Sequence, residues 1–155
     1  GVAVDVSHLS RRGFRDVAGL ARAPFLASHS NCNAVYRHPR SLTDRQIDCI
    51  ITRGGLIGIN LYRAFLGRPG SAGFAAAHRH IRHVLERGGE HVLALGSDFD
   101  GCELEPCFAG VEKLEAFQDY LLANGMPQEQ ADALFYKNAE KFFQTLLQPQ
   151  TDMLK

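Results

Sequence analysis

Short apolar segments alternate with helical patterns along the chain. The apolar segments, which we predict to be strands, cover residues 2–8, 24–30, 56–62 and 91–99. The helical patterns cover residues 10–21, 43–53, 74–87, 110–124 and 127–147. Repeated strand-then-helix order predicts a parallel sheet, because consecutive parallel strands need a crossover that is usually a helix.

Residues at the ends of the helical patterns support these boundaries. Thr43 or Asp44 can cap the N-terminus of the second helix, since both residue types accept hydrogen bonds from the first free backbone N–H groups. Gly54, Gly88 and Gly125 stand where helices end, in positions that favour the left-handed conformation of a C-terminal cap.

The predicted strands are almost continuously apolar, which indicates a sheet that is covered on both faces. Such a sheet is either doubly wound or part of a barrel. No GxGxxG or GxxxxGK loop follows the first strand, which disfavours a nucleotide-binding fold. Instead, His8, His29, Asn60 and Asp98 stand at the strand ends. Because the C-terminal strand ends of a (β/α)8 barrel build its active site, we predict four βα units that form half a barrel.

Composition narrows the function classes. The 155 residues are 45% hydrophobic and 22% charged, which is typical of one globular domain. Seventeen basic residues balance seventeen acidic ones, so we expect no nucleic acid and no anionic membrane surface as a partner. The four cysteines form no CxxC motif and are predicted to be free thiols.

The chain opens on "GVAVDVSH", in the middle of a predicted strand and without an initiator Met, so we expect it to be a fragment. No apolar run approaches the ~20 residues that cross a bilayer, and no leader peptide precedes the first strand. The cellular compartment is therefore open, with the cytoplasm favoured because neither a signal nor an anchor is visible.

His8 and His29 end the first two predicted strands, so their imidazoles should lie side by side at one edge of the sheet. Adjacent neutral imidazoles suit a zinc-like ion, although a single histidine at a strand end is more often structural. Asp5 and His8 would point to opposite faces of a regular strand, which places His8 just past the strand's end. A catalytic metal site needs at least three protein ligands, so further ligands must come from elsewhere.

The motif "GSDFDG" supplies two carboxylates after the fourth strand. Asp98 is the better candidate for chemistry, as general acid, substrate anchor or metal ligand, whereas Asp100 precedes Gly101 and suits a turn. Arg40 is predicted at the same edge of the sheet. Its planar guanidinium could bind a substrate carboxylate, or Arg40 could be a solvated loop residue without a role in binding. His80 and His83, in "HRHIRH", share a face in mid-helix, away from the strand ends, and are interpreted either as packing residues or as residues that support the site's ligands from behind.

Several motifs in order resemble a known family. They are "DVSHLS", "APFLASHSN", "HPRSLTD", "GGLIGINLY", "HIRHVLERGGEHVLALGSDFDG" and "KNAEKFF". Together they resemble the C-terminal half of the membrane (renal) dipeptidases, the M19 metallopeptidase family, over residues 4–146.

This resemblance implies an α/β fold, the C-terminal half of a TIM-like (β/α)8 barrel of the metal-dependent amidohydrolase type, with two zinc ions in the complete active site. By the family's pattern, His8 and His29 ligate one of the metals, Arg40 holds the substrate's C-terminal carboxylate, and Asp98 delivers a proton to the leaving amine. The family's other ligands, a His-x-Asp pair and a bridging glutamate, lie in a half that this chain lacks.

The expected organisation is therefore four βα units over residues 1–148 and a tail over 149–155. The expected function is hydrolysis of dipeptides by a metal-activated bridging water, with the N-terminal half of the same protein required as a partner. A homodimer is compatible with this pattern. The alternatives are a related amidohydrolase that acts on another amide and a non-catalytic binding domain that retains the fold.

General chemistry explains how the two-metal site implied by the resemblance would work. Two metals ~3.5–4 Å apart lower the pKa of a bridging water and polarise the scissile carbonyl, so no nucleophilic side chain is needed. The tetrahedral intermediate collapses only if its nitrogen is protonated, and a carboxyl group such as that of Asp98 fits this task.

Overall fold

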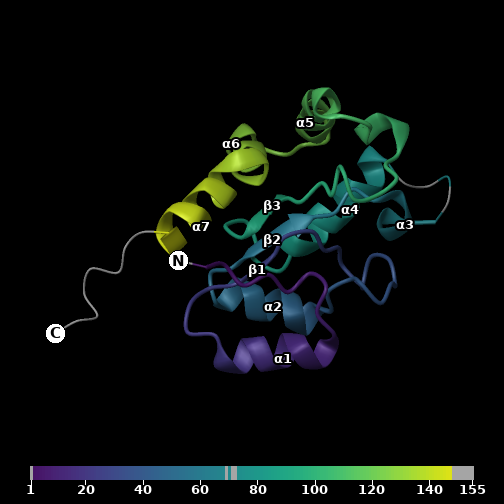
Figure 1. The fold of residues 1–155 in the computed structure, drawn as a ribbon. Helices are drawn as coiled ribbons and strands as arrows, with labels where there is room; N and C mark the ends of the chain where they lie inside the picture. The colour runs from purple at the N-terminus through teal and green to yellow at the C-terminus, as the bar shows by residue number, and fades with distance from the viewer. Residues whose placement is uncertain (1, 69, 71–72, 148–155) are drawn as a thin grey trace.

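Three parallel strands form the centre of the fold (Figure 1). The computed structural model describes residues 2–68, 70 and 73–147. Within them, the strands are β1 (Leu26–Ala27), β2 (Leu56–Ile59) and β3 (Leu93–Leu95), in the order β1-β2-β3. Leu26 pairs with Leu56 and Ile57 with Leu93, so the strands begin at one level of the sheet.

Helices precede, connect and follow these strands. The α-helices are α1 (Arg11–Leu20), α2 (Asp44–Thr52), α3 (Arg63–Leu66), α4 (Phe74–Leu85), α5 (Leu114–Ala123), α6 (Gln128–Asp132) and α7 (Asn138–Leu147). Two 3₁₀ turns, η1 (Pro106–Phe108) and η2 (Val111–Lys113), precede α5, and a π-helical turn, η3 (Ala133–Lys137), joins α6 to α7. None of the helices in the described ranges is long and apolar enough to cross a membrane.

The first predicted strand, residues 2–8, is much shorter than expected. Only Asp5 bridges to Leu26, in parallel orientation, although the backbone hydrogen bonds from Val6 to Leu26 (2.8 Å) and from Leu26 to Val4 (3.0 Å) hold this segment along β1. His8 lies in the turn that follows, as the alternation argument predicted. Residues 2–8 therefore lie beside β1, where a fourth strand would be, but they pair with it over only a few residues.

The residues predicted to cap the helices have the expected conformations, although α4 ends at Leu85 and α5 begins only at Leu114. The backbone N–H of Thr43 donates to Oε1 of Gln46 (2.9 Å), which is half of a capping box at the start of α2. Gly54, Gly88 and Gly125 all have positive φ, at 62°, 79° and 90°. The predicted helix 127–147 is continuous from residue 128 but contains the π-helical turn η3.

Side chains on the two faces of the sheet belong to two separate apolar clusters. Ala27, Ile57 and Leu93 pack in the larger cluster, together with core residues of α1, α2 and α4 such as Phe14, Ile47 and Ile81. Leu26, Leu56 and Ala94 alternate with these residues and pack against Phe142 of α7. We call the face that carries Leu26, Leu56 and Ala94 the inner face, because α1, α2 and α4, the helices between the strands, cover the opposite face, as the helices of a barrel cover its outside.

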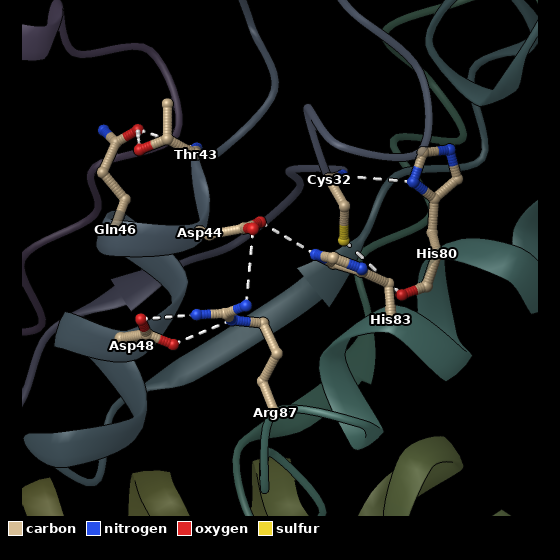
Figure 2. A network of polar contacts seen from close by, with 8 residues as sticks. All are labelled: Cys32, Thr43, Asp44, Gln46, Asp48, His80, His83 and Arg87. Carbon is tan, nitrogen blue, oxygen red and sulfur yellow. Dashed lines mark hydrogen bonds and ion pairs between the residues drawn. The ribbon is translucent and has the colours of Figure 1, made fainter.

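A buried histidine ties α4 to the chain that follows β1 (Figure 2). His80 is fully buried; its Nδ1 accepts from the backbone N–H of Cys32 (3.1 Å), and its Nε2 donates to the carbonyl of Leu66 (3.1 Å). Both ring nitrogens are thus used, with the proton on Nε2. His80 is a packing residue, as predicted from its place in mid-helix, whereas His83 is half-buried and pairs with Asp44 at the surface.

Charged side chains also link α2 with α4 and with Arg87, two positions past the end of α4, on the surface next to His80 (Figure 2). Arg87 makes two hydrogen bonds to the carboxylate of Asp48 (2.8 and 2.6 Å), and His83 contacts Asp44 at 2.8 Å. Because these pairs are partly exposed, each contributes only about 0.2–1 kcal/mol, so the buried His80 is the more important link.

We predict that His80 makes the fold acid-sensitive. Burial lowers the pKa of His80 to about 4, although the Leu66 carbonyl opposes this shift. The unfolded chain binds the proton at pH ~6.5, so stability is fully present above that pH and is lost as the pH falls toward 4. The loss reaches about 3 kcal/mol for this shift.

Urea unfolding of the complete protein between pH 7 and pH 4 measures this loss. His80→Gln keeps an acceptor and a donor but cannot titrate, so its stability should fall less over the same range. A slope equal to that of the wild type would show that His80 is not the group responsible.

Candidate functional site

The two histidines predicted at neighbouring strand ends are in direct contact. His8 lies in the turn after the Asp5 bridge, and His29 lies two residues past β1. Their Nε2 atoms are 2.8 Å apart, and the ring centroids are 4.8 Å apart. The described residues therefore bring two imidazole nitrogens from segments 21 positions apart to one point at the C-terminal edge of the sheet.

Two glycines on the inner face allow the bend that carries His29 to this point. A Cβ at Gly58 would lie 2.0 Å from the carbonyl oxygen of Ser28, and a Cβ at Gly96 would lie 1.9 Å from the same atom. Both distances are far below van der Waals contact, so the Ser28 carbonyl needs glycine at both positions. After this bend, the N–H of Ser30 donates to the Gly58 carbonyl (2.8 Å).

Asp5 and Ser28 hold the other side of the His29 ring. The Ser28 hydroxyl lies 2.6 Å from His29 Nδ1 and donates to Oδ2 of Asp5 (2.5 Å). Oδ1 of Asp5 accepts the backbone N–H groups of Ser7 and Ser28, both at 3.0 Å. Burial raises the pKa of Asp5, but the hydrogen bonds from Ser28 and Ser7 outweigh it and lower the pKa overall.

This order of residues excludes a serine-hydrolase triad. In such a triad the histidine lies between serine and carboxylate and takes the serine's proton. Here Ser28 lies between Asp5 and His29, so its proton points to the carboxylate. Ser28 is a link between two side chains rather than a nucleophile.

The pKa of the His29 ring is lowered, which favours the neutral form that a metal ligand needs. Burial lowers its pKa most; Asp98 and Asp5 raise it, and His8 and Arg40 lower it further. Asp98 and Arg40 therefore lie within electrostatic reach of the ring, as the sequence predicted for residues of one edge. Burial also lowers the pKa of Arg40, although the charges of Asp98 and Asp5 raise it. The Arg40 guanidinium lies 5.9 Å from the ring centroid of Phe65.

Asp98 is fixed by an asparagine at the end of the neighbouring strand. Nδ2 of the fully buried Asn60 donates to Oδ2 of Asp98 (3.1 Å), and Oδ1 of Asn60 accepts from the backbone N–H of Tyr62 (2.6 Å). Asp98 itself has a φ of +62°, which is uncommon for any residue but glycine. Asp100, in contrast, is exposed in the turn.

The donor set fits part of a zinc site. Two neutral imidazoles are typical zinc ligands, and both Nε2 atoms face one another. Their 2.8 Å separation is shorter than the about 3.3 Å expected of two nitrogens at 2.0–2.1 Å from a tetrahedral ion, so the rings need only a small displacement. Across residues 2–68, 70 and 73–147, no group of three or more His, Cys, Asp or Glu side chains is placed to hold a metal ion.

A wide hollow lies elsewhere in the described structure. It measures about 1050 Å³ and is lined by Pro24, Gly55 and Val92, which precede the three strands, and by residues of α7 such as Phe142. These residues are at the N-terminal edge of the sheet, opposite the histidine pair. In a barrel this edge serves stability, so we place the chemistry at the other edge.

Sequence reasoning overlooked the role of Ser28 entirely. Serine before histidine in "ASHS" carries no specific signal, because serine is common in turns. Sequence reasoning assigned Asp5 no role beyond showing that His8 lies past the strand. It identified Asn60 only as a polar residue at a strand end. Their partners could not be known before the fold placed residues 5 and 28, and 60 and 98, side by side.

A family model and several known proteins match this chain. The family model described as membrane dipeptidase (peptidase family M19) matches residues 1–153. A Klebsiella pneumoniae protein encoded in the pqqA 5′ region is 37% identical over 139 residues, which are 87% of this chain and 51% of that protein. An uncharacterized dipeptidase of Schizosaccharomyces pombe is 34% identical, over 78% of this chain and 29% of its own length.

Solved structures show the same relation. The crystal structure of a Rhodobacter sphaeroides metallopeptidase, liganded with a phosphinate mimic of the dipeptide L-Ala-D-Ala, is 37% identical and superposes with a TM-score of 0.86. The match covers 90% of this chain and 41% of that one. The chain spans about half, or less, of the length of these relatives.

The fold prediction is confirmed by these matches: the mixed α/β structure corresponds to part of the barrel of metal-dependent peptidases. The dipeptidases and metallopeptidases among the relatives are hydrolases, as the motifs indicated. The chain belongs to the membrane dipeptidase family, peptidase family M19.

Proposed function

We propose that the complete protein is a zinc-dependent dipeptidase whose active site is formed by this chain together with the other half of the barrel. The observation that supports this most is the contact between the Nε2 atoms of His8 and His29, with Asp98 and Arg40 in electrostatic reach. Membership of the dipeptidase family supports dipeptides as the substrate class. Two zinc ions complete the proposed site, with further ligands supplied by residues outside this chain.

His8 and His29 would hold one ion of the pair through their Nε2 atoms. When bound, the metal pair supplies a water of lowered pKa and polarises the scissile carbonyl. Asp98 would carry the proton that the leaving amine needs, and the hydrogen bond from Asn60 would aim its carboxyl group. No nucleophilic side chain is required, in agreement with the linking position of Ser28.

Metal analysis of the complete protein tests the proposed site. After purification in zinc and dialysis, we expect close to two zinc ions per active site and hydrolysis of dipeptides. His29→Ala should lose chiefly one ion of the pair and most of the activity. His91→Ala, an exposed histidine at the opposite edge of the sheet, is the matched control and should keep both.

A folded protein with no bound zinc would contradict the metal site and favour a binding domain. Two bound ions with hydrolysis of other amides but not of dipeptides would instead favour a related amidohydrolase.

Arg40 should act in substrate binding rather than in bond breaking. Its partly buried guanidinium lies near the site, and a carboxylate clamp is present in both the ground state and the transition state. Arg40→Lys keeps the charge but loses the bidentate fork. We expect a KM raised by about tenfold or more for dipeptides with a free carboxylate, and little change in kcat.

Substrates amidated at the C-terminus are the control for this prediction, because they offer no carboxylate to clamp. Equal losses for free and amidated substrates would show that Arg40 has another role.

A further inference from the structure

We propose that Asp5 and Ser28 set the tautomer of His29, so that its Nε2 always offers a lone pair to the metal. The inference rests on the proposed function for its purpose, but its geometry concerns only residues of this chain. Asp5 and Ser28 are positioning residues in this assignment: they act through His29 and touch no substrate.

The direction of each hydrogen bond follows from what each group can donate. At neutral pH the Asp5 carboxylate is ionised, and an ionised carboxylate can accept hydrogen bonds but cannot donate one. Its Oδ1 receives two backbone N–H groups, so Oδ2 is left for the Ser28 hydroxyl, which must donate to it. A hydroxyl has a single proton, so Ser28 Oγ can only accept from His29 Nδ1, 2.6 Å away.

The proton of neutral His29 is therefore on Nδ1, and Nε2 carries the lone pair. The second imidazole agrees with this assignment, since the 2.8 Å contact requires one proton between the two Nε2 atoms. With His29 Nε2 unprotonated, that proton belongs to His8 in the metal-free protein, and His8 must lose it from Nε2 or shift it to Nδ1 when its Nε2 binds the ion. Partners that fix the other ring nitrogen of a metal-binding histidine typically change metal affinity by 10- to 100-fold.

The backbone holds this arrangement in place. The two backbone N–H groups fix Asp5 across the inner face, and the Ser7 hydroxyl accepts the N–H of His29 at 3.0 Å. The carbonyl of Ser28 is seated over Gly58 and Gly96. The orientation of the Ser28 side chain is thus determined before any metal arrives.

Asp5→Asn gives the sharpest test, because it should reverse the chain of hydrogen bonds. The two backbone N–H groups keep the amide oxygen of Asn in the place of Oδ1, which puts the NH₂ group in the place of Oδ2. That NH₂ donates to Ser28, whose hydroxyl must then donate to His29 Nδ1. The ring proton moves to Nε2, and the metal-binding lone pair is lost without any change in shape.

The measurement is a two-bond ¹H–¹⁵N correlation spectrum of the complete, metal-free protein labelled with ¹⁵N-histidine, in which His29 is assigned by its loss in His29→Ala. We expect the Nδ1–H tautomer in the wild type and the Nε2–H tautomer in Asp5→Asn. Ser28→Ala should leave the ring without its partner and give a mixture. Ser30→Ala is the matched control, because its hydroxyl contacts Ser7 at 3.3 Å rather than the His29 ring, and it should keep the Nδ1–H tautomer.

Zinc titration of the same proteins gives the second readout. We expect Asp5→Asn and Ser28→Ala to raise the dissociation constant of one zinc ion by about 10- to 100-fold, and Ser30→Ala to leave it unchanged. An Nε2–H tautomer in the wild type, or the same Nδ1–H tautomer in Asp5→Asn, would overturn the proposal. Because the spectrum is recorded without metal, a correct tautomer pattern in a protein that binds no zinc would contradict the proposed function instead.

Discussion

Asp98→Asn is expected to lower kcat of the complete enzyme by about a hundred- to ten-thousandfold, the range for loss of a general acid. Asparagine has the same shape, tolerates the positive φ of 62° at this position, and can still accept the hydrogen bond from Asn60. What it cannot do is give up a proton. Zinc content and melting temperature should therefore stay at their wild-type values while turnover is lost.

Asp100→Asn is the matched control, two positions away in the same motif. The Asp100 side chain is exposed, so we expect a change in stability within ~0.5 kcal/mol and near-normal kcat. The assignment is wrong if Asp100→Asn is the inactive, well-folded variant and Asp98→Asn retains turnover.

Gly96→Ala should cause the largest loss of stability among the variants considered. The new Cβ would lie 1.9 Å from the Ser28 carbonyl oxygen and 2.9 Å from the Gly58 Cα, both backbone atoms that cannot rotate away. We expect a loss of about 2–4 kcal/mol in the free energy of unfolding, because the segment after β1 must shift. Since this segment carries His29, zinc affinity should fall together with stability.

Gly19→Ala makes the same chemical change on the exposed surface of α1, where a Cβ would meet nothing within 4 Å. There we expect a gain of up to about 1 kcal/mol, because alanine favours a helix over glycine. Urea unfolding and zinc titration of both variants compare them directly. Unchanged stability and zinc affinity in Gly96→Ala would refute the close approach of Ser28 to the glycine pair.

The helices and their order could be predicted from the sequence because the signals are local. Thr43 and Gly54, at the two ends of α2, act within one turn of the helix, and the structure has them in the predicted roles. The extent of the strands could not be predicted in this way. Strand pairing ends where a neighbouring segment bends away. The apolar run of residues 24–30 does not reveal that the Ser28 carbonyl packs over Gly58 of β2 and over Gly96, directly after β3.

The residues of the candidate site could likewise be predicted only in part. His8, His29 and Asp98 could be selected because the residue types suit metal and acid chemistry and because parallel strand ends meet at one edge. The supporting side chains Ser28 and Asn60 are ordinary residues whose importance arises only from contacts over 23 and 38 positions of sequence. Such contacts depend on the register of the sheet, which no local pattern contains.

The left-handed backbone at Asp98 limits which substitutions at this position evolution can accept. Side chains other than Asp, Asn and Gly are strained at a φ of 62°, so most substitutions there damage the fold as well as the chemistry. Asn and Gly are each one base change away from the Asp codons, and both fit the backbone. Homologues that have lost hydrolysis but keep the barrel for binding should therefore carry Asn or Gly at this position. That single residue would distinguish inactive homologues from active enzymes in a genome sequence.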